Sequence, residues 1–124
     1  MNIICVDASR ITLSGLRERA HSIVPGADVY TCQSAEKAVE LAGTKGCDVL
    51  LTDIEIGGEG DEGIRLASEI QKINPRVNII FITACGEWEY AQDILPLRIS
   101  GYVRKPYDQC ELEKEFENLR YAVS

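Results

Sequence analysis

The chain has 124 residues, enough for a single hydrophobic core, and we expect one domain over residues 1–124. Its formal net charge of -7 argues against nucleic acid or an anionic membrane as a direct partner and favours a cation or a basic protein surface. The five cysteines lack the paired spacing of a zinc site, and the first apolar run is too short for a signal segment, so we expect reduced thiols and a cytoplasmic location.

Short apolar runs alternate with segments of helical periodicity along the whole chain, and capping or turn signals separate them. In chain order the predicted elements are a strand at 2–6, a helix from Ser9 to Pro25, a strand at 28–32, a helix from Ser34 to Gly46, a strand at 47–53, a helix ending at Asn74, a strand at 77–82, a short helix around 88–95, a strand around 102–103 and a helix after Asp108. This alternation predicts an α/β fold whose parallel sheet carries helices on both faces.

Some residues are assigned to these elements by spacing or composition alone. Ile11, Ile73 and Leu95 follow the apolar spacing of the first, third and fourth helices, so they count toward the apolar faces of those helices. Gly43 is expected to take part in closing the second helix. Gly63 is assigned to a glycine-rich acidic loop at 57–63.

Polar residues follow or end four of the five predicted strands. They are Asp7, Asp53, Thr83 and Lys105. Because ligands bind beyond the carboxyl ends of the strands in an open α/β sheet, we expect these side chains to meet at one edge. Taken singly, each also suits a structural role: Asp53 in a turn, Thr83 in a strand and Lys105 before a strand-ending proline. Their joint placement favours a functional site.

The chemistry of these groups indicates phosphoryl transfer onto an aspartate. The carboxylates of Asp7 and Asp53 repel each other unless a cation neutralises them, and a site of oxygen ligands favours magnesium. The Thr83 hydroxyl and the Lys105 ammonium can hold phosphoryl oxygens, because such reactions depend mainly on positioning and electrostatic stabilisation. Asp53 is the predicted acceptor.

Four segments carry a family resemblance. They are Ile4-Cys5-Val6-Asp7, Asp48-Val49-Leu50-Leu51-Thr52-Asp53, Ile80-Phe81-Ile82-Thr83-Ala84 and Gly101-Tyr102-Val103-Arg104-Lys105-Pro106. Each segment is weak alone, but in this order and at this spacing the sequence resembles the receiver domain of bacterial two-component response regulators. The resemblance implies a flavodoxin-like fold, a three-layer doubly wound five-stranded parallel sheet with strand order 2-1-3-4-5.

The same resemblance implies roles for particular residues. Asp53 would accept a phosphoryl group from a sensor histidine kinase, and Thr83 and Lys105 would bind its oxygens. The implied magnesium ligands are Asp7, Asp53 and the backbone carbonyl of Glu55. Thr83 and the aromatic Tyr102 would form the switch. Beyond its own phosphorylation and dephosphorylation, the chain is not expected to be an enzyme.

The resemblance extends to partners and to one local motif. The implied partners are a sensor histidine kinase and an output domain or downstream protein that docks on the fourth helix, fifth strand and fifth helix. A homodimer is also compatible with the resemblance. Glu89-Tyr90-Ala91 stands the same distance before Tyr102 as in receivers that precede a LytTR-type DNA-binding domain. We expect no such domain within this chain, which is either a fragment or a stand-alone receiver. The family also predicts a cis peptide bond before Pro106.

Two features depart from the family pattern. Ala8 stands where a second acidic residue usually follows the first strand, so we expect weaker magnesium binding. The loop after Asp53 carries Gly57 and Gly58 in place of the usual proline.

Two other functions remain open. The substitution at Ala8 also suits a pseudo-receiver, which would bind partners without phosphorylation. A small flavodoxin-like cofactor binder would share the topology, but no glycine- or hydroxyl-rich phosphate loop follows the first strand.

Overall fold

The computed structural model describes residues 1–58 and 60–119, with residues 87 and 88 described by their backbone alone. The strands are β1 (Asn2–Val6), β2 (Asp28–Cys32), β3 (Val49–Thr52), β4 (Asn78–Thr83) and β5 (Ile99–Arg104). The helices are α1 (Arg10–Ile23), α2 (Ala35–Lys45), α3 (Glu62–Ile73), the 3-10 helix η1 (Glu87–Tyr90), α4 (Ala91–Ile94) and α5 (Gln109–Glu117). The predicted alternation of strands and helices is confirmed.

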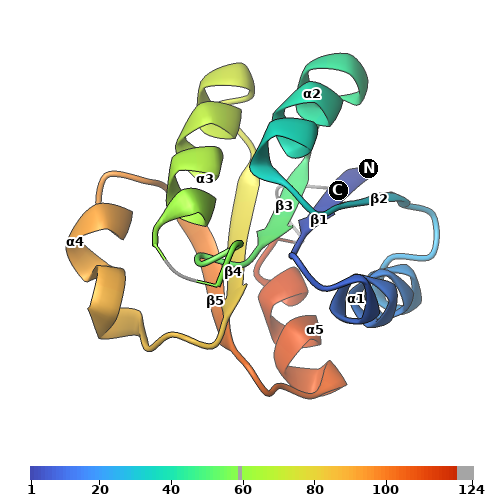
Figure 1. Ribbon diagram of the computed structural model, residues 1–124. Helices are drawn as coiled ribbons and strands as arrows, with labels where there is room; N and C mark the ends of the chain where they lie inside the picture. Colours follow the sequence, from blue (N-terminus) through green and yellow to red (C-terminus); the bar gives the residue numbers. More distant parts are fainter. Residues whose placement is uncertain (59, 120–124) are drawn as a thin grey trace.

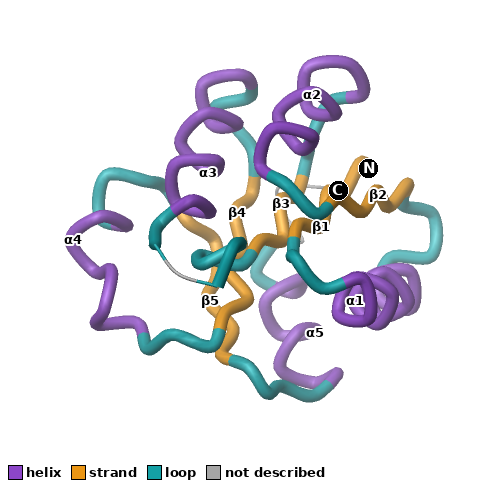
Figure 2. The backbone as a smooth tube through the Cα atoms, viewed as in Figure 1, coloured by secondary structure: helices purple, strands orange, loops and turns teal. Residues whose placement is uncertain are grey.

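The strands form one parallel sheet in the order β2-β1-β3-β4-β5, as the family resemblance implied. Helices cover both faces of this sheet, with α2, α3 and α4 on one side and α1 and α5 on the other (Figures 1 and 2). Successive strand residues point to opposite faces, so Ile4 and Val6 pack toward α2 and α3 while Ile3 and Cys5 pack toward α1 and α5. The flavodoxin-like three-layer architecture is therefore present.

The helices begin and end largely where their sequence signals predict. Side chains cap three of them: Ser9 accepts a hydrogen bond from the Thr12 amide, Ser34 from Lys37 and Asp108 from Glu111. Among the described residues no helix is both long enough and apolar enough to cross a membrane.

Three apolar residues assigned to helix faces are exposed instead. Ile11 is 88% exposed because it lies two residues, about 200°, from Leu13, which faces the sheet in α1. Ile73 ends α3 and is 47% exposed. Leu95 is 79% exposed, since α4 is a single short turn with no buried residue.

Two glycine assignments were wrong. Gly43 lies inside α2, which continues to Lys45 and ends at Gly46, where a positive φ of 86° suits glycine. Gly63 belongs to the first turn of α3 and not to the preceding loop. A Cβ atom at Gly63 would collide with the backbone carbonyl oxygen of Asp53, so glycine allows α3 to begin directly against the end of β3.

Candidate functional site

Strand register brings the ends of β1, β3, β4 and β5 together at one edge of the sheet. Val6 is in register with Thr52, so the residues that follow them, Asp7 and Asp53, emerge side by side. Thr83 is paired with Arg104, which places Lys105 just beyond the end of β4. Because β3 is the central strand, Asp53 lies between the carboxylate from β1 and the groups from β4 and β5.

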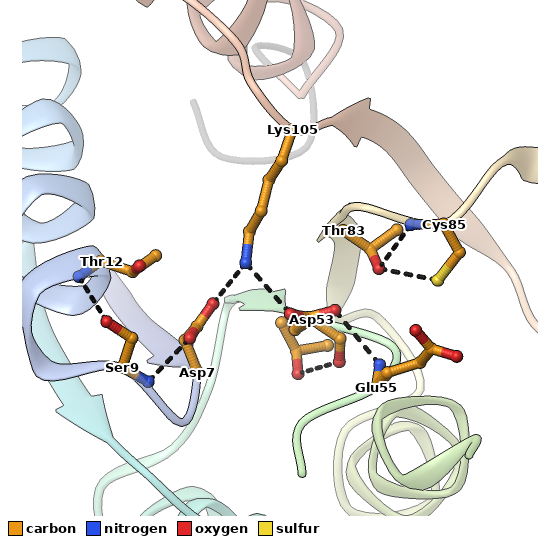
Figure 3. Close-up of polar contacts among 9 residues, drawn as sticks. Asp7, Ser9, Thr12, Asp53, Glu55, Thr83, Cys85 and Lys105 are labelled. Carbon is orange, nitrogen blue, oxygen red and sulfur yellow. Dashed lines mark hydrogen bonds and ion pairs between the residues drawn. The ribbon is translucent and has the colours of Figure 1, made fainter. Parts of the chain in front are cut away.

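Lys105 joins the two carboxylates. Its Nζ atom donates to Asp7 Oδ2 at 2.7 Å and to Asp53 Oδ2 at 3.0 Å (Figure 3). All three side chains are largely buried: Asp7 is 9% exposed, Asp53 15% and Lys105 25%. The predicted meeting of two carboxylates and an ammonium group is thus observed, and one cation already balances part of their charge.

Backbone amides fix the other oxygen of each carboxylate. The Ser9 amide donates to Asp7 Oδ1 at 2.9 Å, and the Glu55 amide donates to Asp53 Oδ1 at 3.1 Å. Hydrogen bonds from backbone amides to charged acceptors are strong and directional. Both carboxylates are therefore held in fixed orientations around the position where Lys105 reaches them.

The pKa of Lys105 is raised by its surroundings. Partial burial lowers the pKa, but hydrogen bonds from the ammonium group to Asp7 and Asp53, together with the charges of both carboxylates, outweigh it. Lys105 is accordingly a permanent cation at physiological pH, suited to hold anionic oxygens.

Thr83 lies at the same edge, fully buried, with its hydroxyl engaged on the far side from Lys105. Thr83 Oγ1 is 3.0 Å from Cys85 Sγ and accepts a hydrogen bond from the Cys85 amide at 3.4 Å. Figure 3 shows Thr83 and Cys85 facing each other beside Asp53. The hydroxyl is therefore engaged with Cys85 in this state.

Tyr102 is half-buried on β5. Its ring packs edge-on against Phe81 with a centroid separation of 6.4 Å, and its hydroxyl donates to the Cys85 carbonyl at 2.9 Å. Thr83 and Tyr102 therefore both contact Cys85, which connects the two residues expected to form the switch. Sequence reasoning did not identify this role for Cys85, although its place two residues after a strand-ending threonine was a usable signal.

The oxygen groups around Asp53 fit a hard divalent cation. Asp7 and Asp53 supply carboxylates, and the Glu55 carbonyl accepts one hydrogen bond, from the Gly58 amide at 2.9 Å, so its second lone pair is available. Ala8 is exposed at this edge and adds no ligand oxygen from its side chain. The residues fit magnesium, with one carboxylate fewer than the family pattern.

Sequence reasoning missed a contact from the side chain of Glu55. Tyr90 Oη donates to Glu55 Oε2 at 2.7 Å and lies 3.0 Å from the Gly60 carbonyl. The hydrogen bond to Glu55 is the main cause that raises the pKa of Tyr90 to about 12. Glu89-Tyr90-Ala91 drew attention in the sequence only as a family motif.

Comparisons with known proteins agree with this geometry. A family model described as the response regulator receiver domain matches residues 3–117. The chain is 25% identical over 118 residues to the transcriptional regulatory protein YesN of Bacillus subtilis, covering 94% of the chain and 32% of YesN. It is 23% identical over 120 residues to the transcriptional regulatory protein LytR of Staphylococcus aureus, covering 97% of the chain and 47% of LytR. The chain thus spans about a third of the length of YesN and about half of the length of LytR.

A solved structure shows the same architecture. It is the N-terminal domain of a response regulator/sensory box/GGDEF three-domain protein from Carboxydothermus hydrogenoformans, with a TM-score of 0.83 and 28% identity. The match covers 98% of this chain and 96% of that one. Because the family model spans almost the whole chain and the strand-end residues meet as the fold requires, the chain belongs to the response regulator receiver domains of two-component systems.

Proposed function

We propose that this chain is a phosphoacceptor receiver, in which Asp53 takes a phosphoryl group from a sensor histidine kinase. The observation that carries the proposal is the bridge from Lys105 to Asp7 and Asp53 at the ends of three strands. A carboxylate oxygen of Asp53 forms a bond to phosphorus while the phosphorus–nitrogen bond of the phosphohistidine breaks, and the imidazole keeps its electron pair and takes a proton. Hydrolysis later transfers the phosphoryl group from Asp53 to water.

The residues of the chain position this reaction. Lys105 can keep one contact to a carboxylate and offer its other protons to phosphoryl oxygens, since an ammonium group carries three donors. The Glu55 amide holds Asp53 Oδ1 in place. Asp7, Asp53 and the Glu55 carbonyl would hold magnesium, which neutralises charge that develops on the transferring group. The only chemistry proposed is the phosphorylation and dephosphorylation of the chain itself.

The switch would follow from contacts that only the phosphorylated state offers. A phosphoryl group on Asp53 offers the Thr83 hydroxyl a stronger acceptor than the Cys85 thiol does. The hydroxyl therefore turns toward Asp53 and gives up its contact with Cys85, the residue whose carbonyl accepts a hydrogen bond from Tyr102. The face formed by α4, β5 and α5 would then change and bind an output domain or a downstream protein. YesN and LytR, both named transcriptional regulatory proteins, make a DNA-binding output domain the favoured partner.

A phosphodonor assay tests this function directly. Incubation with acetyl phosphate and magnesium should add the mass of one phosphoryl group, read by intact mass spectrometry. Asp53→Asn should take up none, whereas Asp48→Asn, at the exposed start of the same strand region, should behave as wild type. Unmodified wild-type protein under conditions that label another receiver would contradict the proposal.

Ala8 supports one alternative function. With no second carboxylate at this position, the chain would be a pseudo-receiver that binds its partner in a single state. In that case partner affinity should be the same for wild type and Asp53→Asn, with or without a phosphodonor. The phosphoacceptor proposal expects affinity to depend on phosphorylation.

A further inference from the structure

Tyr90 connects two segments that lie on either side of the site. It ends η1, directly before α4, and its hydroxyl donates its single proton toward Glu55 Oε2 at 2.7 Å and the Gly60 carbonyl at 3.0 Å. Both acceptors belong to the loop between β3 and α3, 35 and 30 residues away in the sequence. The loop that follows Asp53 and the helix on the expected partner face therefore share a hydrogen bond.

The segment that Tyr90 anchors has few other attachments among its described side chains. No residue of α4 is buried, and Leu95 is 79% exposed. Tyr90, Ile94 and Leu97 pack against the core but are only partly buried. A segment with so little buried apolar surface is held weakly, so a single hydrogen bond to a charged acceptor makes up a large share of what positions it.

Glu55 has three polar groups that face different parts of the site. Its amide donates to Asp53 Oδ1 at 3.1 Å, and its carbonyl is the third oxygen of the proposed cation site. Its carboxylate, at the far end of the same residue, accepts the Tyr90 hydroxyl. A cation held by the Glu55 carbonyl and the Asp53 carboxylate would therefore act directly on the residue on which Tyr90 depends.

We propose that Tyr90 is a positioning residue that transmits cation binding at Asp53 through Glu55 to α4, before any phosphoryl group is present. This coupling rests on the proposed function, because it needs the cation site. It differs in its contacts from the path through Thr83 and Tyr102, which runs along the end of β4 to the Cys85 carbonyl, and the two paths come close where the Glu55 carboxylate lies within 4.8 Å of Cys85 Sγ. The position of α4 then responds both to cation binding and to phosphorylation.

A magnesium titration followed by amide NMR of the full chain tests the coupling. In the wild type, amide shifts of Asp53 and Glu55 and those of Ala91, Ile94 and Leu95 should change with a common midpoint. Tyr90→Phe removes only the hydroxyl, so magnesium-dependent shifts at Asp53 and Glu55 should persist while those in α4 are lost. Tyr30→Phe, on the edge strand β2, is the matched control and should respond as wild type.

A second variant tests whether the effect of Tyr90→Phe comes from the lost hydrogen bond or from a local packing defect. Glu55→Asp keeps the backbone carbonyl and the charge but shortens the side chain, so its carboxylate should no longer reach Tyr90 and α4 should again stop responding. Wild-type shifts in α4 for both variants would overturn the Tyr90 link and leave the cation site standing. Wild-type protein without any magnesium-dependent shift at Asp7, Asp53 or Glu55 would overturn the cation site, and the coupling with it.

Discussion

Lys105 bridges two carboxylates with one ammonium group, and that arrangement defines the site at the scale of single residues. Asp7 and Asp53 lie within hydrogen-bonding distance of the same nitrogen and are each held by a backbone amide. Two partly buried like charges would otherwise repel, which is the usual reason that such pairs bind a cation. The single positive charge of Lys105 leaves the pair of carboxylates with a net negative charge, which can attract a divalent ion. Ala8 contributes no further negative charge.

Restoring a carboxylate at position 8 should strengthen magnesium binding. The variant Ala8→Asp adds a negatively charged oxygen ligand at the exposed edge beside Asp7, and we expect about tenfold tighter binding, or about 1.4 kcal/mol. Isothermal titration calorimetry measures the change, with Ala8→Asn as the uncharged control. Equal affinity for Ala8→Asp and wild type would place the cation elsewhere.

Thiol reactivity should single out one cysteine. Burial raises the pKa of Cys32 to about 11 and that of Cys47 to about 12, and it also raises the pKa of Cys5 and Cys85. Only Cys110 is exposed, at the start of α5. Because the thiolate is the nucleophile, iodoacetamide at pH 8 should label Cys110 first and leave the four buried thiols largely unmodified.

Peptide mapping by mass spectrometry identifies the labelled residue. Cys110→Ser should remove the fast phase, and denatured wild type should label at all five cysteines. Rapid labelling of Cys5 or Cys47 in the native protein would show that the sheet core opens readily.

At the scale of elements, the start of α3 is fixed by the end of β3. The Gly63 amide donates to the Ile54 carbonyl at 2.8 Å, and the absence of a side chain lets the helix approach the Asp53 backbone closely. The loop that carries Glu55 is therefore bounded by Asp53 on one side and by a helix packed against its backbone on the other. The α2 glycine Gly43, by contrast, faces open space.

Gly63→Ala should destabilise the protein and disturb the site, whereas Gly43→Ala should not. A methyl group at position 63 would overlap the Asp53 carbonyl, and such overpacking costs roughly 1–3 kcal/mol of the free energy of unfolding. At position 43 the same change should stabilise α2 by about 0.5–1 kcal/mol. Urea unfolding measures both effects, and a neutral or stabilising Gly63→Ala would contradict the close approach.

At the scale of the whole molecule, the chain is an acidic α/β domain whose sheet edge gathers groups from four strands. A ligand that binds only this assembled edge stabilises the folded state by mass action, because the unfolded chain does not bring Asp7 and Asp53 together. Magnesium binding is thus a test of the tertiary arrangement as well as of single residues.

Thermal unfolding should therefore depend on magnesium concentration. At tenfold the dissociation constant, the expected gain in the free energy of unfolding is about 1.4 kcal/mol. Asp53→Asn should show a smaller gain, and an equal ionic strength of sodium chloride is the control for general screening. If the melting temperature of wild type rises no more with magnesium than with sodium chloride, the assembled cation site is wrong.

The sequence by itself determined the alternation of strands and helices and the four strand-end residues of the site, and its family resemblance supplied the order of the strands. Apolar runs of strand length ending in Asp7, Asp53, Thr83 and Lys105 are enough to predict where these groups meet, because the ends of parallel strands share one edge. Caps at Ser9, Ser34 and Asp108 were also readable, since they act within a few residues of chain.

Only the tertiary structure decided contacts between segments distant in the chain. The hydrogen bond from Tyr90 to Glu55 joins two loops whose relative placement no local pattern encodes, and the contact of Cys85 with both Thr83 and Tyr102 depends on the packing of β4 against β5. The exposure of Ile11 and Leu95 and the close approach at Gly63 have the same origin. Periodicity gives the face of a helix, but how much of that face is covered depends on where the helix docks on the sheet.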